Sequence, residues 1–154
     1  MKTEKEKEEI MNAKTIKMQE FLEANKIECF DLQKTNDEQQ TAIFRSRMQI
    51  NGQTLPFAIL IDTSVYTLLQ VQIAAGLVKD EKFAKLAPFL NEMNNNYWLF
   101  KFVVLPDGDL VMNSCITAKD GNFDPELINA ILGEILKFLE SEYPKIMSKV
   151  WNEK

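Results

Sequence analysis

The sequence predicts an α+β fold: an antiparallel β-sheet with helices packed on one face. Two turn signals, Asn51-Gly52 and Asp107-Gly108, each separate a pair of apolar, alternating runs, as is typical of β-hairpins. Three longer segments instead place apolar residues at helical spacing. Strands joined by short turns favour antiparallel pairing, and the predicted order is α-β-β-β-β-α-β-β-α.

The first predicted helix covers residues 4–25. Its predicted apolar stripe consists of Ile10, Ala13, Lys14, Ile16, Lys17 and Phe21, with Leu22 as a further candidate, and Glu and Lys cover the remaining surface. Asn25 is expected to end the helix because Asn tolerates the left-handed conformation. Residues 1–8 are rich in Glu and Lys, and we expect them to be frayed.

A candidate strand at 27–34 precedes the first hairpin, whose strands cover 41–50 and 53–62. A two-residue Asn-Gly turn pairs residues whose numbers sum to 103, so that Met48 faces Leu55. This register collects apolar side chains on one face, and a one-residue slip would invert one strand. A further strand is predicted at 65–73.

The second helix is predicted to start at Asp80 as its N-cap and to contain Pro88, which requires a kink or a break. The last helix is predicted to start at Asp124-Pro125, because proline is favoured at the first helical position. Pro144 is expected to kink this helix near its end.

A strand pair at 97–105 and 109–117 lies between these helices. If Leu105 faces Leu110, then Val103 faces Met112. Alternation places Trp98, Phe100, Phe102 and Val104 on one face, where we interpret the rings as core aromatics. The opposite face carries Leu99, Val103 and Leu105 beside Lys101, and it is largely apolar, whereas a strand face exposed to water should be polar. We therefore predict that these three residues form a dimer or partner interface.

Composition limits the possible classes of protein. The chain has 154 residues, 45% hydrophobic and 27% charged, which fits a single folded domain over 1–154. No apolar run is long enough to span a membrane, and the first residues lack the apolar core of a secretory signal. A net charge of −5 argues against nucleic acid and anionic membranes as partners. We expect a cytoplasmic protein.

The sequence predicts no catalytic residue, metal site or cofactor. Histidine is absent, which excludes His-based triads and common zinc motifs, and no phosphate-binding or nucleophile-elbow motif occurs. Cys29 and Cys115 are expected to be small buried side chains. Asp107-Gly108-Asp109 is interpreted as a turn, because the other ligands of a calcium loop are missing. We predict that the chain is not an enzyme.

Arg45 and Arg47 are the only arginines, two positions apart and therefore on one face of a strand. They are the candidate residues for anion recognition, since a guanidinium binds carboxylate or phosphate well. The simpler interpretation is a solvated strand face.

From residues 90–110 and 123–151 the chain resembles the YbjN-like family, whose fold is similar to that of type III secretion chaperones. The resemblance rests on Leu90-Asn91 and Met93-Asn94, then Trp98 with Phe100-Lys101-Phe102-Val103, the Asp107-Gly108 turn, and Tyr143-Pro144. It implies a non-enzymatic chaperone-like or regulatory module, commonly a homodimer, that binds a protein partner. The alternative is a small-molecule or anion sensor that uses Arg45 and Arg47.

Overall fold

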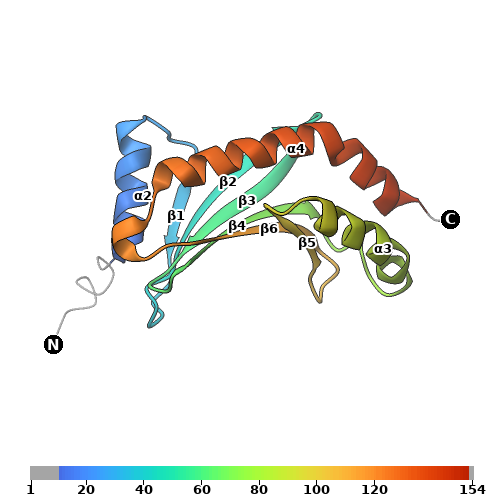
Figure 1. Cartoon of the computed structure of the whole chain (residues 1–154), viewed down its shortest axis with the longest axis horizontal. Helices are drawn as coiled ribbons and strands as arrows, with labels where there is room; N and C mark the ends of the chain where they lie inside the picture. Colours follow the sequence, from blue (N-terminus) through green and yellow to red (C-terminus); the bar gives the residue numbers. More distant parts are fainter. Residues whose placement is uncertain (1–10, 153–154) are drawn as a thin grey trace. The chain divides into compact units, whose positions relative to one another are not determined.

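The computed structural model describes residues 11–152 and confirms the predicted α+β class and element order (Figure 1). The elements are α2 (Ala13–Ala24), β1 (Asp31–Lys34), β2 (Ala42–Ile50), β3 (Gln53–Ile61), β4 (Tyr66–Ala74), α3 (Glu81–Asn96), β5 (Lys101–Val104), β6 (Leu110–Thr117), a short 3-10 turn (Asp120–Asn122) and α4 (Pro125–Trp151). The six strands form one antiparallel sheet in the order β1-β2-β3-β4-β6-β5. The predicted fraying of residues 1–8 lies outside the described residues.

The chain divides into two compact units, each built from segments that are distant in sequence. Unit 1 comprises the described part of Met1–Ser46 together with Ala58–Leu69 and Cys115–Leu132. Unit 2 comprises Arg47–Phe57, Gln70–Ser114 and the described part of Gly133–Lys154. Each unit has its own buried apolar residues, as expected where aliphatic and aromatic side chains are removed from water.

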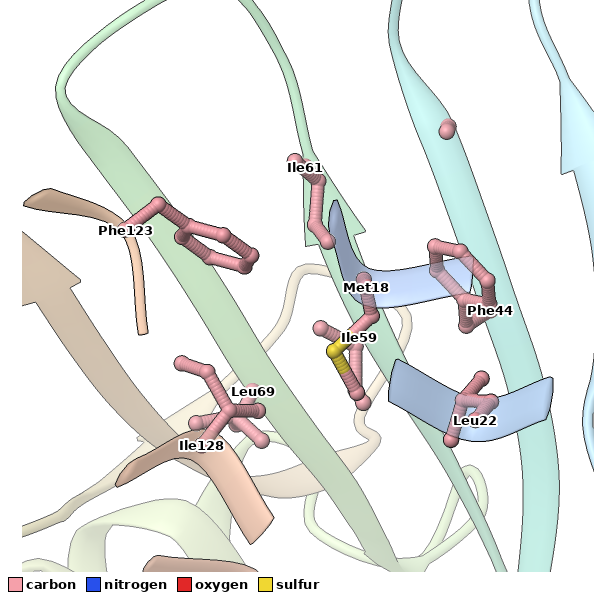
Figure 2. Packing of buried hydrophobic residues seen from close by; sticks show 9 residues of the cluster. Met18, Leu22, Phe44, Ile59, Ile61, Leu69, Phe123 and Ile128 are labelled. Atoms are coloured by element: carbon pink, nitrogen blue, oxygen red, sulfur yellow. The ribbon is translucent and has the colours of Figure 1, made fainter. Parts of the chain in front are cut away.

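The core of unit 1 lies between helical residues and the strand face that carries Phe44, Ile59 and Ile61 (Figure 2). Met18 and Leu22 come from α2, and Ile128 comes from the start of α4. Leu69 and Phe123 complete the contact between strands and helices. The helices therefore cover this face, and the neighbouring positions on β2, Arg45 and Arg47, belong to the other face.

The buried residues of helix α2 match the predicted set only in part. Met18 and Leu22 are buried with Lys14, whereas Ala13 and Ile16 are exposed. Lys14 lies on the predicted buried face, but its positive charge then has to be stabilised in the protein interior. Its ammonium donates to oxygens around the turn between β3 and β4, which compensates for the loss of water.

The ends of α2 also differ in detail from the expectation. Asn12 is the N-cap, with its Oδ1 accepting the N–H of Thr15 at 2.8 Å. At the other end it is Lys26, with φ 53°, that adopts the left-handed conformation. Asn25 has φ −98° and instead donates its side-chain amide to the carbonyl of Phe21. The predicted left-handed residue was therefore wrong by one position.

The first hairpin forms as predicted. Asn51 and Gly52 have φ 49° and 81°, the positive values that a type I′ turn needs at both central residues. Gln49 donates to Thr54 at 2.8 Å across the strands, as expected from the predicted pairing. The candidate strand at 27–34 is also real but shorter, and β1 pairs with β2 by placing Asp31 opposite Arg45.

The two later helices each contain a proline within the helix, rather than ending at it. Asp80 occupies the N-cap position of α3, but its side chain makes no capping hydrogen bond and its φ is 49°. Asp124 does accept the N–H of Glu126 at 3.0 Å, and α4 begins at Pro125 as predicted. Helix α4 continues through Pro144, and Figure 1 shows it changing direction towards its C-terminal end.

The second hairpin has a different register from the predicted one. Phe102 pairs with Met112 and Val103 with Val111, which is one residue away from the expected pairing. The reason is a three-residue loop, 106–108: the N–H of Gly108 bonds to the carbonyl of Leu105, and Gly108 has φ 87°. A glycine in the left-handed region commonly closes such loops. Strand β5 begins only at Lys101, so the predicted strand start at Tyr97 was wrong.

Both cysteines are exposed and free, which contradicts the prediction that they are buried. Cys29 precedes β1, a four-residue edge strand, and Cys115 lies in β6 with its side chain exposed to water. No helix within residues 11–152 is long and apolar enough to cross a membrane.

Candidate protein-binding surface

The segment from Tyr97 to Leu105 in unit 2 has one buried face and one exposed apolar face. Phe100 and Phe102 are buried, as predicted. Trp98 is 91% exposed, so the interpretation of this ring as a core aromatic was wrong. Since β5 starts at Lys101, the alternation of a strand does not extend back to Trp98 and cannot turn the indole inwards.

Of the three predicted interface residues, Leu99 directly follows Trp98 in the chain, and two of the three are exposed. Leu99 is 39% exposed and Val103 is 36% exposed, whereas Leu105 is half-buried. We call the exposed group Trp98, Leu99 and Val103 the Trp98 surface. Exposed apolar side chains that form a contiguous patch are a feature of interaction sites.

An aromatic cluster of Tyr97, Phe100 and Phe138 adjoins Trp98. The ring of Phe138, in α4, lies 4.7 Å from the ring of Tyr97 and 4.4 Å from that of Phe100, measured between centroids. Tyr97 and Phe100 are themselves stacked at 5.7 Å. Such ring pairs fix each other's orientation, so the backbone under Trp98 is held in place by packing.

A shallow hollow of about 500 Å³ adjoins the indole of Trp98. Its walls are Asn96, Tyr97, Trp98, Leu99, Phe100, Glu134, Lys137, Phe138, Ser141 and Glu142. The wall therefore combines aromatic side chains, including Phe138 of α4, with polar side chains that come mostly from α4. This composition suits a partner's apolar side chain with a polar rim.

Asn94, at the end of α3, satisfies the free edge of β5. Its Oδ1 accepts the N–H of Phe102 at 2.6 Å, and its Nδ2 donates to the carbonyl of Phe102 at 3.2 Å. The side-chain amide thus replaces a neighbouring strand at this residue. Lys101 donates to the carbonyls of Asn94 and Tyr97, which places its positive charge at the C-terminus of α3.

Sequence reasoning missed three contributors to this surface: Asn94 as an edge cap, and Tyr97 and Phe138 as ring partners. The Asn-rich run before Tyr97 signalled a helix end but not which amide would bond to the strand. Phe138 lies directly before Leu139, on the flank of the predicted helix face, so its position was compatible with partial burial.

Arg45 and Arg47 are both exposed on β2. The Nε of Arg45 donates to the Oε1 of Gln33 at 3.2 Å, and Asp31 is its cross-strand partner. A carboxylate opposite Arg45 reduces the local positive charge available for an anion. Anion recognition by this pair stays a prediction.

The described residues contain no group of three or more His, Cys, Asp or Glu side chains arranged to hold a metal ion. Tyr143, on α4, is buried, and burial raises the pKa of its phenol. The chemistry of the Trp98 surface is that of apolar and aromatic contact.

Comparison with known proteins identifies the class. The model of the YbjN family, described as "Putative bacterial sensory transduction regulator", matches residues 18–146. The chain belongs to the YbjN family. The comparison with curated proteins found no match.

Solved structures provide the fold. A chain in the structure described as "Crystal Structure of the ExsC-ExsE Complex" is similar, with a TM-score of 0.54 and 17% sequence identity over 88% of this chain and 96% of that chain. The resemblance to the YbjN-like family is therefore confirmed, and the solved chain has a similar fold.

Proposed function

We propose that this chain is a non-enzymatic chaperone-like or regulatory module that binds a protein partner and acts as a homodimer. The observation that carries the proposal is the Trp98 surface, where an almost fully exposed indole adjoins an aromatic hollow. The family description and the neighbour's description as an ExsC-ExsE complex support a regulatory or protein-binding role. We further propose that the protein works in the cytoplasm.

The proposed homodimer uses the Trp98 surface of both copies. In a two-fold dimer the same surface contacts itself, so Trp98 of one copy can enter the hollow beside Tyr97 and Phe138 of the other. Leu99 and Val103 would become buried in the same contact, with Leu105 at its margin. Burial of a large indole in such a pocket is a common source of association energy.

The molar mass in solution tests this proposal. Light scattering after size-exclusion chromatography is expected to give twice the chain mass of 17.8 kDa at micromolar concentration. Trp98→Ser and Leu99→Glu are expected to shift the protein to monomer, because both side chains are exposed and their replacement leaves the core intact.

Two controls separate the interface from general surface effects. Leu127→Glu places the same charge at another exposed leucine, and Trp151→Ser removes the other exposed indole. Both are expected to keep the dimer. A wild-type monomer at micromolar concentration, or equal dissociation in the controls, would contradict a dimer through the Trp98 surface.

Both arginines on β2 are exposed, which supports a second candidate function as a sensor of small anions. If this function is correct, phosphate or a carboxylate metabolite will raise the melting temperature of the wild type. The increase will vanish in Arg45→Ala/Arg47→Ala. An equal increase in that variant would exclude the arginine pair as the site.

A further inference from the structure

A second hollow in unit 2 lies between α3 and the C-terminal part of α4. It has a volume of about 360 Å³, and we call it the α3–α4 groove. Its walls are Lys82, Lys85, Leu86, Pro88, Phe89, Glu92, Lys149 and Asn152. The groove is separate in sequence from the Trp98 surface and shares no lining residue with the hollow there.

Lysine side chains lie over aromatic rings along this groove. The Nζ atoms of Lys145 and Lys149 lie 5.9 and 5.6 Å from the ring centroid of Phe89. The Nζ of Lys82 lies 5.7 Å from the ring of Trp151, which is itself exposed. Cation–π contacts of this kind hold the ammonium groups at the surface of the ring without neutralising their charge.

The charge of the groove is opposite to that of the chain. Three lysines and one glutamate line it, with Lys145 close by, whereas the whole chain has a net charge of −5. The floor of the groove is apolar, since it consists of the buried Leu86 and the half-buried Phe89. A basic rim around an apolar floor is complementary to a polypeptide that alternates acidic and apolar side chains.

Other ligand classes fit this groove less well. A compact polyanion such as phosphate favours several donors that converge on one point, whereas these lysines are distributed along two helices and Glu92 shares the wall. Nucleic acid would encounter the excess negative charge of the remaining chain. A peptide can place its carboxylates at separate lysines and an apolar side chain between them.

We propose that the α3–α4 groove binds an acidic segment of a protein partner, with carboxylates at Lys82 and Lys149 and an apolar side chain against Phe89. This inference rests on the proposed protein-binding role but uses a different surface from the dimer contact. Its failure would leave the dimer proposal intact, since the two have separate measurements.

The probe is a fluorescein-labelled dodecapeptide of Glu and Leu, titrated with the 154-residue chain in fluorescence anisotropy. Saturable binding is expected, together with clear weakening when salt is raised. A peptide in which every Glu is replaced by Gln is expected to bind at least about tenfold more weakly. No saturable binding of the acidic peptide, or equal binding of the Gln peptide, would overturn the proposal.

Matched charge reversals locate the peptide. Lys149→Glu is expected to weaken binding about tenfold, because one attraction is replaced by a repulsion. Lys119→Glu makes the same change in net charge at an exposed lysine of unit 1 and is expected to change affinity less than about twofold. Similar weakening by both variants would show non-specific attraction and exclude the groove.

The two tryptophans supply a local readout. In Trp98→Phe the only indole left is Trp151, beside Lys82, so peptide binding is expected to shift its emission. In Trp151→Phe the only indole left is Trp98, whose emission is expected to stay constant. A shift in the emission of Trp98 alone would place the peptide at the Trp98 surface and overturn the assignment to the α3–α4 groove.

Other occupants give different results. Competition by inorganic phosphate at low millimolar concentration, at constant ionic strength, would identify a small-anion site and overturn the proposal. Deletion of residues 1–10, which include four glutamates, is expected to leave peptide affinity unchanged. A roughly tenfold increase in affinity after that deletion would identify the chain's own N-terminal segment as the occupant.

Discussion

Lys14 shows how a single side chain can contradict the pattern of its helix. The residue is 0% exposed, and its ammonium donates to the carbonyls of Ser64 and Tyr66 at 2.8 and 2.9 Å. It also lies 3.3 Å from the hydroxyl of Thr67. A buried charge is tolerated when oxygens surround it in this way, so Lys14 fastens α2 to the turn between β3 and β4.

Replacement of Lys14 by Met is expected to lower the free energy of unfolding by about 1–3 kcal/mol at pH 7, because carbonyls lose a charged donor. Lys17→Met is the control on the same helix. The ammonium of Lys17 donates to the carbonyl of Asp120 in an exposed hydrogen bond, so a cost of about 0.5 kcal/mol or less is expected. Urea unfolding measures both, and equal costs would contradict this role of Lys14.

The stability of the protein should also depend on the charge of Lys14. Burial lowers the pKa of its ammonium below 10.5, although the carboxylates of Asp62 and Asp120 oppose this shift. Between the folded-state pKa and 10.5 the unfolded state therefore binds more protons, and the free energy of unfolding rises with pH. The difference in unfolding free energy between wild type and Lys14→Met is expected to widen towards pH 10.5. A constant difference from pH 8 to pH 10.5 would contradict the lowered pKa.

Asn94→Ala removes the side-chain oxygen that accepts from the Phe102 N–H and the side-chain N–H that donates to the Phe102 carbonyl. We expect a loss of about 1–3 kcal/mol in unfolding free energy, since the N–H and carbonyl of a partly buried strand edge lose their hydrogen bonds. Asn95→Ala, at an exposed neighbouring position, is the control and should cost far less. Urea unfolding separates the two, and faster aggregation is expected only for Asn94→Ala.

At the scale of elements, the second hairpin depends on Gly108. A Cβ there would lie 2.5 Å from the Cγ of Lys79, and the φ of 87° disfavours any side chain. Gly108→Ala is therefore expected to cost about 1–3 kcal/mol. In α4, Gly133→Ala should instead stabilise by up to about 1 kcal/mol, because helix propensity improves and its Cβ meets no described atom within 4 Å. Thermal unfolding of both variants checks the opposite signs.

The elements that the sequence predicted well were those with strong local signals. Asn51-Gly52 determined both the turn and the register of the first hairpin, and Asp124-Pro125 determined the start of α4. The second hairpin was wrong by one residue, because Asp107-Gly108 fits a two-residue or a three-residue loop. Only the hydrogen bonds around Gly108 distinguish these loops.

For the molecule as a whole, the fold class and element order followed from the sequence, but the candidate site was predicted only in part. Leu99 and Val103 are exposed as their pattern implied, whereas the exposure of Trp98 depends on where β5 begins. The α3–α4 groove needs Lys82 and Lys149 to come together from distant segments, which no local pattern can indicate.

The two proposed surfaces are expected to act independently. Trp98→Ser should halve the molar mass and leave the affinity for the acidic peptide unchanged within about twofold. Lys149→Glu should weaken binding of the acidic peptide and leave the molar mass of the protein unchanged. Light scattering and anisotropy on both single variants and the double variant provide the measurement. Loss of peptide binding in Trp98→Ser would show that one surface requires the other.

The amide of Asn94 has a consequence for selectivity. A sheet edge with unoccupied backbone groups can recruit almost any extended chain, because main-chain pairing is largely indifferent to sequence. At Phe102 those groups are already bonded within the chain. At this residue, main-chain pairing with a partner is therefore not available, and recognition has to depend on the shape and polarity of the partner's side chains.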